Sequence, residues 1–68
     1  MKARVKDIPV GVSAATPQWI DRFVPGMRDF IGKELKFTEM TLGKEIVKDW
    51  WTTRATSFNF HISWLEEL

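Results

Sequence analysis

The last third of the chain carries the clearest pattern of alternating apolar and polar positions. Phe58, Phe60 and Ile62 alternate with polar residues. This period of two predicts a strand with the three apolar side chains on one face. The segment from Trp50 to Leu65 also holds three of the four tryptophans. We therefore expect the rest of the chain to pack against this segment.

The alternation of apolar with polar residues and the content of β-branched residues predict strands at five places along the chain. These segments are residues 2–8, 33–41, 45–53, 56–62 and 65–68. In the second of them, Leu35 and Phe37 fall on one face, which is typical of a half-buried strand. Gly43 predicts a tight connection to the third strand. Ser63 and Trp64 fit a single 3₁₀ turn before the last strand.

Residues 9–31 predict a long connection that contains a short helix. Thr16 is the expected N-cap and Pro17 the expected first helical residue. The helix is then expected to run to Pro25-Gly26, where proline and glycine would stop it. Its apolar residues at helical spacing are Trp19, Ile20, Phe23 and Val24. Gly32 predicts a bend before the next strand.

The short connections between the predicted strands favour a small barrel. We expect the strand at residues 2–8 to pair with the terminal strand, because this pairing would protect both edges. The connection 9–31 would then cover one mouth of the barrel. The length of 68 residues predicts one domain, residues 1–68.

Composition excludes several classes of protein. With no cysteine and one histidine, the sequence lacks disulfides and the usual ligands of a structural zinc site. Ten basic and nine acidic residues give a net charge of +1, without the basic excess typical of nucleic-acid binders. No apolar run reaches the length of a membrane span, and no apolar stretch follows the basic start as in a secretory signal. We therefore expect a cytoplasmic protein.

Residues with catalytic potential are few. His61 is the only imidazole, and it falls on the polar face of the predicted strand. Ser63 is its nearest hydroxyl, but on one face of a strand the two residues would be about 7 Å apart, too far for a hydrogen bond. The carboxylates show no spacing typical of a metal loop or an acid–base pair. We expect neither enzymatic activity nor a cofactor.

Trp50 and Trp51 are the strongest candidates for a binding surface. Adjacent residues of a strand face opposite sides, so only one of the two rings is expected in the core. An exposed tryptophan is typical of a binding hot spot, and we place it beside Arg54, with Trp19 or His61 at the border. The alternative is that the connection 9–31 buries the second ring.

A second hypothesis is a surface for nucleic acid. Lys44, Lys48 and Arg54 lie on the predicted hairpin near the same tryptophans. Cations beside an aromatic ring suit single-stranded nucleic acid. Lys36 would add to this surface, whereas interleaved acidic residues would weaken its field. Steep loss of binding with salt would support this hypothesis over a protein partner.

Three short motifs resemble short SH3-like barrel proteins of bacteriophages and bacteria. They are Asp7-Ile8-Pro9, Met27-Arg28-Asp29-Phe30-Ile31-Gly32-Lys33 and Trp64-Leu65-Glu66. The resemblance implies an SH3-like barrel. With the strands and the helix predicted above, the expected fold is mostly β, a small SH3-like barrel of about five strands with a short helical insertion in the first long loop. The resemblance also implies a non-enzymatic accessory protein that binds and modulates a host protein in the host cytoplasm. The family carries no catalytic motif.

Overall fold

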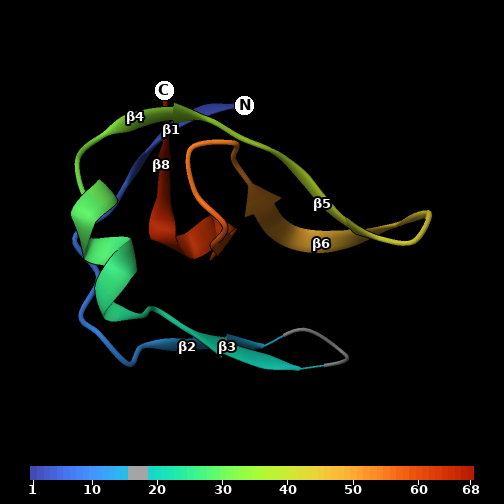
Figure 1. Cartoon of the computed structure of the whole chain (residues 1–68), viewed down its shortest axis with the longest axis horizontal. Coiled ribbons are helices and arrows are strands. Elements are labelled where there is room, and N and C mark those ends of the chain that lie inside the picture. Colours follow the sequence, from blue (N-terminus) through green and yellow to red (C-terminus); the bar gives the residue numbers. More distant parts are fainter. Residues whose placement is uncertain (16–18) are drawn as a thin grey trace.

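The computed structural model describes residues 1–15 and 19–68, and in these the chain is mostly β (Figure 1). The predicted fold class is therefore confirmed at this level. The described residues form eight short strands and two 3₁₀ helices where about five longer strands were predicted. Their bounds are β1 Lys2–Val5, β2 Ser13–Ala15, β3 Ile20–Arg22, η1 Pro25–Phe30, β4 Glu34–Lys36, β5 Thr38–Leu42, β6 Glu45–Thr52, β7 Asn59–His61, η2 Ile62–Trp64 and β8 Leu65–Glu67.

The described strands form three antiparallel sheets, not one continuous closed ladder. Their orders are β4-β1-β8, β5-β6-β7 and β2-β3. The first strand pairs with the last, with Arg4 opposite Glu66, so this predicted pairing is confirmed. The predicted 3₁₀ turn before the last strand is confirmed by η2. In Figure 1 the β2–β3 hairpin lies below the β5–β6 hairpin, and β1, β4 and β8 lie together at the upper left.

The strand predicted at residues 33–41 is divided at Phe37. The Phe37 ring is buried and meets Phe60 edge-on, with 5.6 Å between ring centroids. Its backbone N–H donates to the Met1 carbonyl at 2.7 Å. Because Phe37 is held by β1 and by the core, β4 belongs to one sheet and β5 to another. The strand predicted at 56–62 is also shorter, since only residues 59–61 pair with β6.

The helix predicted at residues 19–24 is wrong, because β3 lies there and pairs with β2. Trp19 and Asp21 are half-buried and Phe23 is buried, whereas Ile20 is 69% exposed. This is the period of two of a strand. The Trp19 indole N–H donates to the Asp21 carboxylate at 3.1 Å, so a polar residue shares the inward face. That polar residue concealed the alternation in the sequence.

A helical segment does lie in the first long connection, but it begins where the predicted helix was expected to end. Pro25 is the first residue of η1, where its missing N–H costs no hydrogen bond. The expected cap, Thr16, and Pro17 lie outside the described residues. Gly32 follows η1 with φ of 79°, which confirms the predicted bend before β4.

One hydrophobic core joins the sheets and η1. Three aromatic rings form its centre: Trp64 meets Phe23 edge-on at 5.5 Å and Trp50 edge-on at 5.6 Å. Phe23 therefore attaches the β2–β3 hairpin to the rest of the molecule. Edge-to-face contacts stabilise by about 0.5–1.5 kcal/mol beyond the burial of area. The buried members are Ala3, Val5, Phe23, Met27, Phe37, Met40, Val47, Trp50, Phe60, Trp64 and Leu65.

A bulge in β6 allows two side chains of one strand to enter this core. Glu39 pairs with Trp51, and Thr41 pairs with Ile46. Only Met40 lies between the two paired residues on β5, whereas residues 47–50 lie between their partners on β6. Val47 and Trp50 are three residues apart and would face opposite sides of a regular strand, yet both are buried. The bulge includes Asp49, whose φ of 69° lies in the left-handed region.

Substitution of Asp49 tests this backbone conformation. A β-branched residue is disfavoured at positive φ, so we expect Asp49→Val to lower the free energy of unfolding by about 1–2 kcal/mol. Asp49→Gly should be at least as stable as the natural protein, because glycine has no Cβ to clash. Urea unfolding monitored by tryptophan fluorescence measures both. Equal stability of the valine and glycine variants would contradict the assigned conformation.

Candidate functional site

The two adjacent tryptophans have different environments. Trp50 is 1% exposed and packs between Trp64 and His61, whose ring centroid lies 5.3 Å away. Trp51 lies opposite Glu39 and Phe60 in the sheet and is half-buried against the core. Of the pair, therefore, only Trp51 reaches the surface. The first long connection contributes Phe23 to this aromatic cluster, through its edge-on contact with Trp64.

His61 has a structural role at the start of η2. Its Nδ1 accepts the Ser63 backbone N–H at 3.1 Å and lies 2.8 Å from the Ser63 hydroxyl. The expectation that His61 and Ser63 lie too far apart for a hydrogen bond is wrong. After His61 the chain leaves the strand and forms a 3₁₀ turn, which brings the two residues closer together. The imidazole thus satisfies a free backbone donor at the turn. It also stacks edge-on against two tryptophans.

The described residues contain no group of three or more histidine, aspartate or glutamate side chains placed to hold a metal ion. Among the same residues, neither helix has the length and apolar character needed to span a membrane.

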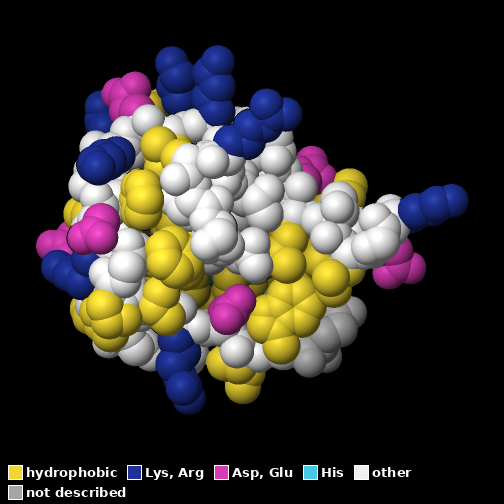
Figure 2. Space-filling model, in the orientation of Figure 1, with side chains coloured by type: hydrophobic (Ala, Val, Ile, Leu, Met, Phe, Trp, Pro, Cys, Tyr) yellow, Lys and Arg dark blue, Asp and Glu magenta, His cyan; other side chains and the backbone are white. Residues whose placement is uncertain are grey.

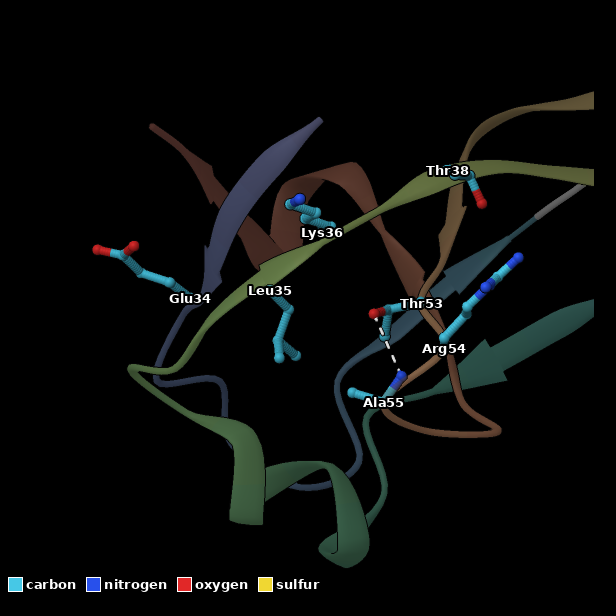
Figure 3. Close-up of a pocket in the computed structure, with 7 residues that line it drawn as sticks. All are labelled: Glu34, Leu35, Lys36, Thr38, Thr53, Arg54 and Ala55. Carbon is cyan, nitrogen blue, oxygen red and sulfur yellow. Dashed lines mark hydrogen bonds between the residues drawn. The ribbon is translucent and has the colours of Figure 1, made fainter.

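A hollow of about 610 Å³ lies between β4 and the turn that follows β6 (Figure 3). Leu35 points into it from one side, and Thr53 and Ala55 face it from the other. The Ala55 N–H donates to the Thr53 hydroxyl at 3.5 Å, which helps to shape the turn. Seven residues line the hollow: Glu34, Leu35, Lys36, Thr38, Thr53, Arg54 and Ala55.

The hollow arises where two neighbouring strands separate. β5 pairs with β6 as far as Thr38 and Thr52, whose hydroxyl oxygens lie 3.3 Å apart. Beyond this pair β4 turns toward β1, while residues 53–55 turn away toward β7. The hollow between β4 and residues 53–55 therefore exists because the strand is divided at Phe37, where β4 leaves the sheet that contains β5 and β6.

The rim of the hollow is basic. Neither Lys36 nor Arg54 forms an ion pair with any described residue. The carboxylate of Glu34, by contrast, is bound by Arg4 at 2.9 Å. Figure 2 shows lysine and arginine side chains gathered over β1, β4 and the start of β5. An anionic group would find free cations at this rim, beside an apolar floor.

The structure brings together only part of the residues selected from the sequence. Arg54 lines the hollow, but Trp51, Trp19 and His61 do not. Lys36, expected only as part of a basic face, also lines it. The apolar floor and the two threonines were missed, because the separation of β4 from the turn depends on contacts distant in sequence.

The other two cations of the proposed nucleic-acid surface lie along the β5–β6 hairpin. Lys44 is in its turn and Lys48 is on β6 within the bulge, and both are exposed. Neither lines the hollow that contains Arg54. Lys44 and Lys48 therefore provide charges outside the hollow.

Several large apolar side chains are also exposed. Val10, Val12 and Ile20 lie on the β2–β3 hairpin or just before it, and Leu42 and Ile46 lie on the β5–β6 hairpin. None of these side chains lines the hollow beside β4. That hollow, with polar groups at its rim and an apolar floor, is the candidate site.

Comparisons of the chain with protein-family models, with curated proteins and with solved structures found no match. The function is therefore argued from the geometry of the hollow and from the resemblance in the sequence motifs.

Proposed function

We propose that the chain is a non-enzymatic binding module with an SH3-like barrel. Its role would be that of a phage-encoded or phage-like accessory protein that binds and modulates a host protein in the cytoplasm. The pairing of β1 with β8 and the 3₁₀ turn before β8 support the barrel, because both were expected from that architecture. The bent β4–β5 segment, which contributes to two sheets, supports it further.

The observation that carries the proposal is the hollow between β4 and residues 53–55. It combines an apolar floor at Leu35 and Ala55 with hydroxyl groups and with two cations that form no ion pair with a described residue. Its volume is in the range of about 300–1,000 Å³ typical of ligand sites. A few polar groups around an apolar surface suit recognition by contact and hydrogen bonding.

A protein partner fits this surface better than nucleic acid. A nucleic-acid surface usually shows an extended basic patch or stripe, whereas the lining of the hollow combines Lys36 and Arg54 with the acidic Glu34. The net charge of +1 supports the same choice. Apolar floor residues also favour a peptide side chain over a phosphate backbone.

Affinity capture tests the proposal. Tagged protein is incubated with a bacterial lysate, with and without nuclease, and the bound proteins are identified by mass spectrometry. We expect one stoichiometric protein that survives nuclease treatment. Recovery of nucleic acid, or of many proteins lost after nuclease treatment, would favour the Lys44, Lys48 and Arg54 surface and reject the proposal.

A further inference from the structure

β4 has one paired edge and one open edge. Phe37 and Met1 exchange two backbone hydrogen bonds, each of 2.7 Å. In an antiparallel ladder, hydrogen-bonded residue pairs alternate with pairs that form no hydrogen bond to each other. Lys36 and Lys2 are the next pair along, so the N–H and C=O groups of each residue point away from the other strand. The Lys2 carbonyl confirms this, because it accepts from Leu68 on the opposite side, at 3.0 Å. The Lys36 N–H and C=O therefore point away from β1.

The open edge of β4 faces the hollow. In the described residues β4 pairs with β1 alone, and Lys36 and Glu34 make no backbone hydrogen bond outside the ladders. Both residues line the hollow, and the turn 53–55 lies across it. An open strand edge is a template for pairing with another extended chain.

The charges beside this edge favour an acidic chain. Lys2 and Lys36 are direct cross-strand partners, and such a pair of like charges repels. Neither lysine forms an ion pair with a described residue, and neither does Arg54. The carboxylate of Glu34, two residues before Lys36 on the same strand, is already held by Arg4. A carboxylate opposite Lys36 on the open side of β4 would offset this positive charge.

We propose that the open edge of β4 binds an extended acidic segment of a partner protein by addition of a strand. The segment would bond to the backbone of Lys36 and place carboxylates beside Lys36 and Arg54. Its alternate side chains would be apolar and would rest on Leu35 and Ala55, since successive residues of a strand face opposite sides. The inference rests on the proposed protein-binding function and names the partner chemistry of the same hollow.

A blocked six-residue peptide that alternates glutamate and valine tests this site. Binding is followed by ¹H–¹⁵N NMR titration and by amide hydrogen exchange. We expect saturable binding, with shifts at residues 34–36 and 53–55 and slower exchange of the Lys36 N–H. No binding at millimolar peptide, or binding without protection of Lys36, would overturn strand addition. Equal binding of the peptide that carries lysine in place of glutamate would overturn the charge recognition.

Charge reversal locates the contact. The double variant K36E/R54E should bind the acidic peptide at least about tenfold more weakly, because two attractive pairs become repulsive. The matched control K44E/K48E makes the same change in net charge outside the hollow and should bind as the natural protein does. Equal weakening in both variants would overturn the site. A lysate protein retained by K36E/R54E would also overturn it, while leaving the binding-module proposal intact.

Discussion

Replacement of Trp50 by alanine is expected to leave much of the protein unfolded at room temperature. Trp50 is 1% exposed and meets the rings of Trp64 and His61, so its removal creates a large cavity at the centre of the core. Truncation of a buried tryptophan costs about 3–5 kcal/mol. A chain of 68 residues has a total stability of only about 3–10 kcal/mol, so this loss takes most of it.

Thermal unfolding followed by near-ultraviolet circular dichroism measures the effect. The melting temperature should fall by more than about 12 °C, at about 4–8 °C per kcal/mol for a domain of this size. Trp51→Ala is the matched control and should remain folded, because Trp51 is only half-buried. A Trp51→Ala variant less stable than Trp50→Ala would contradict the assignment of the core ring.

Trp50→Phe separates the ring from its polar group. The Trp50 indole N–H is buried and has no hydrogen-bond partner among the described residues. Phenylalanine keeps an aromatic ring and removes that unsatisfied donor, whose burial costs about 1–3 kcal/mol. We therefore expect Trp50→Phe to recover more than half of the stability lost in Trp50→Ala. Equal loss in both variants would show that the indole N–H has a partner in solution.

Gly26→Ala is expected to lower the free energy of unfolding by about 1–3 kcal/mol, through overpacking. A Cβ at this position would lie 2.7 Å from the Cζ atom of Phe58 and 3.2 Å from its Cε2 atom. The Phe58 ring is half-buried, and the Phe58 N–H is held by the Thr56 hydroxyl at 2.7 Å. The ring therefore has to move, or η1 has to shift.

A double-mutant cycle with Phe58→Ala isolates this contact. In that background Gly26→Ala should cost much less, because its methyl group enters the space left by the ring. We expect a coupling free energy of at least about 1 kcal/mol, measured by urea unfolding of the four proteins. Additive effects would mean that Gly26 and Phe58 are not in contact.

Local signals in the sequence were sufficient for much of the fold. The strands predicted at residues 2–8 and 45–53 and the turn at Gly43 depend on neighbours in sequence. Strands do lie there, at Lys2–Val5 and Glu45–Thr52, although the first is three residues shorter than predicted. The pairing of the first strand with the last was also predicted correctly. It followed from the need to protect two strand edges.

The β2–β3 hairpin depends on information that a linear pattern does not carry. Trp19, Ile20 and Phe23 fit helical spacing as well as a strand, and the choice depends on pairing with residues 13–15. Asp21 on the inward face, bonded to the indole of Trp19, obscured the strand period further. A tertiary partner thus decided between two local structures that the sequence allows.

The candidate site was predicted only at Arg54 and Lys36. Both were selected for their charge, which is a local property. The hollow itself arises because Phe37 divides one predicted strand between two sheets, which parts β4 from residues 53–55. Which tryptophan is buried likewise depends on the β6 bulge, and no spacing rule indicates a left-handed Asp49.

Parallel capture from a nuclease-treated bacterial lysate tests the central claim, that the hollow beside β4 binds a protein. Natural protein, K36E/R54E and K44E/K48E are compared at equal loading, after their folded state has been confirmed by circular dichroism. We expect one partner that is retained by the natural protein and by K44E/K48E and is lost from K36E/R54E. The same partner retained equally by all three proteins would contradict the claim.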